Sequence, residues 1–153
     1  MKFDIDRKKV NIFKIGKLYC FKQYLDDREL YDRLSEYYNQ KKYRFECKTV
    51  GERNKIMKLL FSKGYEPIPV EDFKGYMVKI DRYKKYGSIL KNSIEHTELG
   101  SDRIFVMKDM FAVERALEDG AEQFTDEIDV ERLILWFNWL DYLGNTFIII
   151  LYT

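Results

Sequence analysis

The sequence has 153 residues, of which 35% are charged and 46% hydrophobic, and its net charge is +1. This balance argues against a disordered chain and against a strongly cationic nucleic-acid binder. A chain of this length can bury a core without disulfides or metals, so we expect one globular domain over residues 1–153. Aromatic residues are frequent, and lysine and glutamate are plentiful, which is a composition common in thermophiles.

The two cysteines, Cys20 and Cys47, have no cysteine or histidine at metal-ligand spacing. They are therefore predicted to be buried free thiols, which suits a reducing cytoplasm. The first ten residues, MKFDIDRKKV, include acidic side chains and no apolar segment, so no signal peptide is expected. We expect a cytoplasmic protein that holds neither a metal nor a cofactor.

The first predicted element is a hairpin or bulged strand within Val10–Leu25. Apolar and polar residues alternate there, and Gly16 interrupts the alternation. Asp26 and Glu29 then form a D-x-x-E pattern, in which the aspartate can cap a helix and the glutamate can reach back. The apolar spacing that follows predicts a helix that extends to about Lys41.

The stretch YRFECK, which follows this helix, has the alternation of a half-buried strand. A period of two places Phe45 and Cys47 on one face. The same period places three charged side chains on the other face, where we expect them to meet water: Arg44, Glu46 and Lys48.

A capped helix should follow this strand. Thr49 and Glu52 form the T-x-x-E pattern of a helix start, and Gly64 suits the left-handed residue that ends a helix. A weaker copy of this plan follows Arg103, with Asp109 as the cap and Gly120 as the end of the helix. Two such units joined by an antiparallel strand predict an α/β (α+β) fold. Its plan is a ferredoxin-like split βαβ, with a mostly antiparallel sheet and amphipathic helices on one face.

Between the two units lie a proline-rich segment and a polar segment. The prolines of EPIPV exclude a continuing helix and lead to a predicted strand over Tyr76–Ile80. Leu90 and Ile94 are four residues apart, which favours a helix over Ser88–Leu99. Two short strands are the alternative for that segment.

The C-terminal third is the most apolar part of the chain. Residues 127–143 are interpreted as a helix that ends at Gly144, or as the first strand of a hairpin that turns there. A helix would be apolar on more than one side, which predicts a homodimer whose interface contains Trp136, Phe137, Trp139 and Leu140. A membrane span over Leu133–Tyr152 is disfavoured, because Asp141 lies near its centre.

The sharpest catalytic candidate is the pair Glu46 and Lys48. A carboxylate and an ammonium on one strand face can hold a divalent ion and assist an attacking water. The E-x-K spacing resembles the second half of the PD-(D/E)xK nuclease motif over three residues. That resemblance implies a metal-dependent nuclease, whose second carboxylate would have to come from Asp4 or Asp6. The alternative is a solvated row of charges on an amphipathic strand.

Basic and aromatic residues interleave in two clusters, which predicts contacts to phosphates and bases. No RNP-type aromatic pattern lies on a strand. The candidate cations are Lys41, Lys42, Arg44, Arg82, Lys84 and Lys85.

Three functions follow from these patterns. The favoured hypothesis is a non-enzymatic α/β binding or protein-interaction domain that self-associates. The alternatives are a nucleic-acid-binding protein that uses the lysine–tyrosine clusters, and a PD-(D/E)xK-like nuclease.

Overall fold

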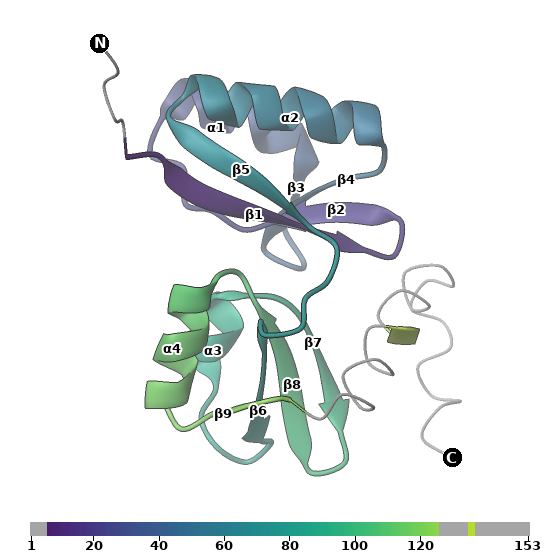
Figure 1. The fold of residues 1–153 in the computed structure, drawn as a ribbon, viewed down its shortest axis with the longest axis vertical. Coiled ribbons are helices and arrows are strands. Elements are labelled where there is room, and N and C mark those ends of the chain that lie inside the picture. The colour runs from purple at the N-terminus through teal and green to yellow at the C-terminus, as the bar shows by residue number, and fades with distance from the viewer. Residues whose placement is uncertain (1–5, 126–134, 137–153) are drawn as a thin grey trace.

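The computed structural model describes residues 6–125 and 135–136 of the chain (Figure 1). Within this part, the strands form one sheet of five strands and one of four, and most strand pairs are antiparallel. Helices accompany each sheet. The structure therefore confirms the α+β class.

The first sheet forms from the N-terminal half of the chain. Its spatial order is β3 (Tyr38–Asn39), β4 (Arg44–Cys47), β2 (Leu18–Phe21), β1 (Lys8–Ile15) and β5 (Tyr65–Val70). Strands β1 and β5 are parallel, and the other neighbours are antiparallel. The β1–β2 hairpin turns at Gly16, whose φ of 62° confirms the predicted interruption.

The second sheet forms from the C-terminal half. Its spatial order is β7 (Ser93–Leu99), β8 (Asp102–Met107), β6 (Met77–Asp81) and β9 (Glu122–Gln123). All of its pairs are antiparallel. Strand β6 confirms the predicted strand over Tyr76–Ile80 to within one residue at each end.

The helices divide between the two sheets: α1 (Arg28–Leu34), the 3-10 turn η1 (Ser35–Tyr37) and α2 (Val50–Ser62) in the first half, and α3 (Gly87–Lys91) and α4 (Met110–Glu118) in the second. Figure 1 shows α1 and α2 on the side of the first sheet that faces away from the second half. In the second half, α3 and α4 lie beside the second sheet, on the face opposite to the cluster that it shares with the first sheet.

Three hydrophobic clusters hold the sheets and helices together. One lies between the first sheet and its helices, and it includes Ile12, Phe45 and Leu60. A second lies between the second sheet and α3 and α4. The third joins the two sheets, because Phe13 of β1 and Ile104 of β8 belong to it. Apolar residues are buried on both faces of the first sheet. The hydrophobic effect therefore stabilises its packing against its own helices and against the second sheet.

The predicted recurrence of strand, cap, helix and glycine is confirmed. Thr49 accepts a hydrogen bond from the Glu52 amide at 3.1 Å, and Asp109 accepts one from the Ala112 amide at 2.7 Å. Gly64 and Gly120 follow the two helices with φ of 95° and 100°. Both helices thus begin and end where local chemistry satisfies their terminal main-chain groups.

The ferredoxin-like plan is not confirmed. The pairings make β4 and β5 parallel across two intervening strands, and β8 and β9 parallel across one. Each half therefore contains a split βαβ connection, but the strands are divided between two sheets. Helices also cover both outer faces of the pair and not one face only.

Two predicted helices are wrong in extent. The helix expected to extend to Lys41 ends at Leu34, because a 3-10 turn and β3 follow it, and its cap is Asp27. The helix expected over Ser88–Leu99 ends at Lys91, after which the chain enters β7. Pairing of β7 along β8 outweighs the helical spacing of Leu90 and Ile94 there.

Strand β5 forms one edge of the first sheet and contains Pro67 and Pro69. Two residues apart, these prolines present their main-chain groups on the same side of the strand. Because proline has no N–H, it is confined to the side of an edge strand that faces away from the neighbour. The outer side of β5 therefore lacks donors at both positions.

The prediction for residues 127–143, helix or hairpin, lies outside the described residues except at Leu135 and Trp136, which are helical. Trp136 packs against the cluster that joins the two sheets of its own chain. The other predicted interface residues, Phe137, Trp139 and Leu140, lie outside the described part. Self-association therefore stays a prediction. Every helix in residues 6–125 and 135–136 is too short or too polar to cross a bilayer.

Candidate functional site

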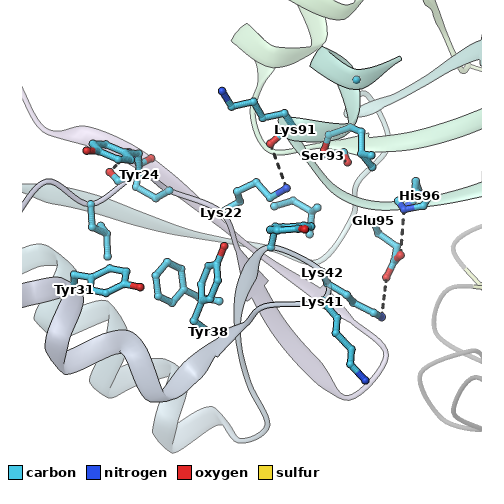
Figure 2. Close-up of a pocket in the computed structure, with 17 residues that line it drawn as sticks. Lys22, Tyr24, Tyr31, Tyr38, Lys41, Lys42, Lys91, Ser93, Glu95 and His96 are labelled. Carbon is cyan, nitrogen blue, oxygen red and sulfur yellow. Dashed lines mark hydrogen bonds and ion pairs between the residues drawn. The ribbon is translucent and has the colours of Figure 1, made fainter. Parts of the chain in front are cut away.

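A cleft of about 700 Å³ lies at the seam between the two halves of the chain (Figure 2). Its walls come from the end of β2, from α1, from the β3–β4 turn, and from α3 and β7. We name it the lysine–tyrosine cleft after its charged and aromatic lining residues: Lys22, Lys41, Lys42, Lys91, Tyr24, Tyr31, Tyr38 and Tyr43. Glu95 is the only carboxylate among the described lining residues, so the cleft has an excess of positive charge.

The β3–β4 turn positions one side of the cleft. The Asn39 side-chain oxygen accepts hydrogen bonds from the amides of Lys41 and Lys42, at 2.9 and 3.2 Å. The Asn39 amide group in turn donates to Glu46 at 3.0 Å. Tyr43 has a φ of 54°, in the left-handed region that L side chains rarely adopt. The turn therefore fixes the main chain from which the two lysines and the tyrosine project.

An aromatic wall supports the same side. Phe21 and Phe45 stack with ring centroids 4.9 Å apart, and the Tyr38 ring meets Phe45 edge-on at 5.0 Å. Partial desolvation by its neighbours raises the pKa of the Tyr38 phenol. Its ring is thus firmly held. In contrast, the Tyr24 side chain at the rim is 82% exposed.

Lys22 lies deeper in the cleft than the other lysines. Its ammonium donates to the main-chain oxygen of Lys91 at 3.2 Å, a contact drawn in Figure 2. Desolvation, together with the nearby charges of Lys108 and Arg44, lowers the pKa of Lys22 to about 8. No ion pair involves Lys22 among the described residues, so this cation has no compensating anion within that part of the chain.

Glu95 and His96 of β7 form the opposite side of the cleft. Glu95 is 3.7 Å from the Lys42 ammonium, and its other oxygen accepts the His96 amide at 3.1 Å. The His96 ring lies 5.7 Å from the Phe105 ring. Desolvation lowers the pKa of His96, and the cations Arg103, Lys42 and Lys22 lower it further, against the effect of Glu95. A neutral imidazole is therefore expected at pH 7.

The expectation that Arg44 faces water is wrong. Its side chain is 1% exposed, because the second half covers this face of β4. It bonds to Glu46 at 3.0 Å, to Glu95 at 3.1 Å and to the main-chain oxygen of Ile94 at 2.7 Å. These partners occupy its Nε and Nη1 donors. Arg44 thus joins the two halves, and its role in binding nucleic acid stays a prediction.

Among the described residues, the nuclease candidates Glu46 and Lys48 have no second carboxylate beside them that would complete a metal site. Glu46 accepts from Asn39 and Arg44, and Lys48 is exposed beyond the end of β4. In the described part of the chain, no three His, Cys, Asp or Glu side chains come close enough to hold a metal ion. Asp6 is described and Asp4 is not.

The second predicted basic cluster lies away from the cleft. Arg82, Lys84 and Lys85 are exposed in the turn after β6, where the Arg82 guanidinium lies 5.2 Å from the Tyr83 ring. The helix that follows this turn does line the cleft, through Gly87, Leu90 and Lys91. The structure therefore brings Lys41 and Lys42 together with lysines that belong to neither predicted cluster.

Two cleft lysines, Lys22 and Lys91, had not been predicted. Lys22 follows the hairpin strand directly, and the nearby Tyr24 is the only feature of the sequence that indicates a place for Lys22 in a basic and aromatic cleft. Lys91 fell within the segment that was assigned to a longer helix. No family model, no curated protein and no solved structure matches the chain.

Proposed function

We propose that the lysine–tyrosine cleft binds a single-stranded nucleic acid. The observation that carries the proposal is the lining itself, in which four lysines and four tyrosines converge on one cavity. Single-strand binders combine a positively charged groove with aromatic rings on which bases stack. Tyr24 and Tyr43 are 82% and 67% exposed, so their ring faces are free to take a base.

The size of the cleft favours a single strand over a duplex. A cavity of about 700 Å³ is in the range of sites that enclose small organic ligands. A double helix is too wide to enter it, whereas an unpaired strand can place one or two nucleotides there. An acidic peptide would satisfy the lysines but would leave the exposed rings of Tyr24 and Tyr43 without a stacking partner.

The aromatic part of the proposal is tested with a matched pair of tyrosines. Tyr24→Ala removes a ring that is 82% exposed inside the cleft, and Tyr83→Ala removes one that is 83% exposed outside it. The affinity of each variant for a labelled single strand is measured by fluorescence anisotropy. A strand of about ten nucleotides is within the length range of known single-strand sites. Stacking predicts a loss of about tenfold for Tyr24→Ala and none for Tyr83→Ala.

The cationic part has a second matched pair. The double variant Lys41→Gln and Lys42→Gln removes two charges from the cleft, and Lys84→Gln with Lys85→Gln removes two from the turn outside it. The first is expected to lower affinity and to flatten its dependence on salt, because fewer counterions are released. Absence of binding to both single-stranded DNA and RNA at low salt would refute the proposed function. If the two double variants lose affinity equally, the nucleic acid binds outside the cleft.

A further inference from the structure

Lys22 differs from the other cations of the cleft in its surroundings. It is only partly exposed, whereas Lys41, Lys42 and Lys91 are exposed. Its one hydrogen bond in the described part of the chain goes to the Lys91 carbonyl at 3.2 Å. An ammonium has three N–H donors, so two have no acceptor among residues 6–125 and 135–136.

The groups that face Lys22 do not compensate its charge. Lys108 follows β8, and Arg44 of β4 is paired with Glu46 and Glu95. Glu95 and His96 of β7 line the same cleft, but Glu95 is bonded to Arg44, and the pKa of His96 is lowered in part by Lys22. A desolvated cation among cations costs stability, since an opposite charge is needed to offset desolvation. This pocket is therefore complementary to an anion, and the described residues place no carboxylate on Lys22.

We propose that the Lys22 ammonium is the phosphate-binding point of the cleft and holds one phosphate of the bound strand. The inference rests on the proposed function, and it assigns phosphate binding to the deepest lysine of the cleft. Tyr24 lies two residues further along the chain and also lines the cleft. A phosphate on Lys22 therefore places the adjoining sugar and base near the exposed Tyr24 ring. The phosphate is either the terminal group of a strand or an internal phosphodiester.

Phosphate binding at Lys22 has a pH signature. An adjacent anion favours the protonated lysine, so binding above pH 8 takes up a proton. Affinity is then expected to fall between about pH 7 and pH 9, below the range in which ordinary tyrosines and lysines titrate. In Lys22→Arg the fall should disappear, because a guanidinium stays charged. His96 titrates below this window and leaves it unaffected.

The experiment measures anisotropy of a labelled oligothymidylate of about ten nucleotides, with or without a 5′- or 3′-terminal phosphate. Lys22→Gln is expected to weaken binding about tenfold or more and to reduce the salt slope by about 0.7. Lys22→Arg should bind as wild type with a flat pH profile. Lys58→Gln, on the exposed side of α2, is the control and should change nothing. A loss confined to the phosphorylated oligomers identifies a terminal phosphate, and an equal loss for all identifies an internal one.

Failure of this inference is separable from failure of the proposed function. If the oligomers bind but Lys22→Gln keeps the affinity, salt slope and pH profile of the wild type, the phosphate point is wrong and the cleft proposal stands. If no oligomer binds, titration with inorganic phosphate followed by NMR still tests Lys22. Shifts centred on Lys22 that vanish in Lys22→Gln would support the phosphate point alone, and their absence would overturn it.

Discussion

Arg44 and Lys22 are two cations that the fold removes from water at the same seam, and they differ in their partners. Arg44 has two carboxylates and a main-chain oxygen within 3.1 Å. Lys22 has one main-chain oxygen, at 3.2 Å, and cationic neighbours. We expect removal of a cation that is paired with carboxylates to destabilise the fold, and removal of one without a carboxylate partner among the described residues to affect binding instead. Charge alone does not separate a structural residue from a binding residue, but the set of partners does.

The largest effect is expected from breaking the compensated site. Arg44→Ala removes the buried cation that bonds to Glu46 and Glu95 and leaves Glu95 only the more distant Lys42, and loss of one partner of a buried pair costs about 3 kcal/mol or more. Urea unfolding measures the free energy of unfolding. Arg44→Met with Glu95→Gln should recover part of the loss, because the carboxylate that was left unpaired is then neutral. A loss for Arg44→Ala no greater than that of an exposed arginine would contradict the structural role.

For Lys22 the change in the free energy of unfolding is expected to have the opposite sign. Lys22→Gln removes an uncompensated charge, so the free energy of unfolding at pH 7 should rise by about 1 to 2 kcal/mol. The cost of the wild-type charge is fully present below pH 8. It is lost as pH rises from about 8 towards the usual lysine value of 10.5, because the folded state then binds fewer protons than the unfolded state. The variant's advantage should therefore vanish near pH 10.

This second measurement separates a binding residue from a structural one. If a variant is more stable than the wild type and binds the oligomer more weakly, the replaced side chain serves binding and is not needed for folding. If Lys22→Gln is destabilised at pH 7 by as much as Arg44→Ala, the contrast between the two cations is false.

Tyr43 provides a smaller test of the same kind. Tyr43→Asn places a residue that tolerates the left-handed conformation at a φ of 54°, so stability should rise by about 0.5 kcal/mol. Binding of the oligomer should weaken, because the ring is lost. Thermal unfolding and anisotropy measure the two effects. Tyr24→Asn is the control, since it removes a cleft ring without relieving a positive φ and should weaken binding with no gain in stability.

The smallest effect belongs to a third cation, Lys63, which is paired with two carboxylates that water reaches. Lys63 lies 3.2 Å from Glu29 and 3.7 Å from Asp27. The hydrogen bond to Glu29 is the main cause of its raised pKa. Lys63→Gln should leave the urea midpoint close to that of the wild type, because water and salt screen such pairs. A shift comparable to that of Arg44→Ala would show that pairing, and not burial, sets the cost.

Local chemistry explains which elements could be predicted from the sequence. The helix after Thr49 was predicted with its cap and its closing glycine, because these depend on neighbours in sequence. The helix after Asp109 was predicted for the same reason. The position of Arg44 could not be predicted from the alternation of YRFECK. The face of β4 that carries Arg44 is covered by β7, which lies about fifty residues further along the chain.

The cleft was predicted only in part, for the same physical reason. Lys41 and Lys42 belong to a visible basic and aromatic cluster, and both line the cleft. Lys22 and Lys91 come from the ends of a strand and a short helix that are distant in sequence. Only the packing of the two halves brings them together. The assignment of β7 to a helix concealed that wall as well, since it hid Glu95 and His96.

The two prolines of β5 affect how the chain behaves when it is concentrated. Growth of a sheet by addition of strands from other copies requires that each edge both donates and accepts along its length. At Pro67 and Pro69 the outer side of β5 can only accept. A second copy that approaches this edge finds an interrupted ladder, so the contact cannot propagate into a fibre. The first sheet is in this way closed to polymerisation along β5, without any other element having to cover that edge.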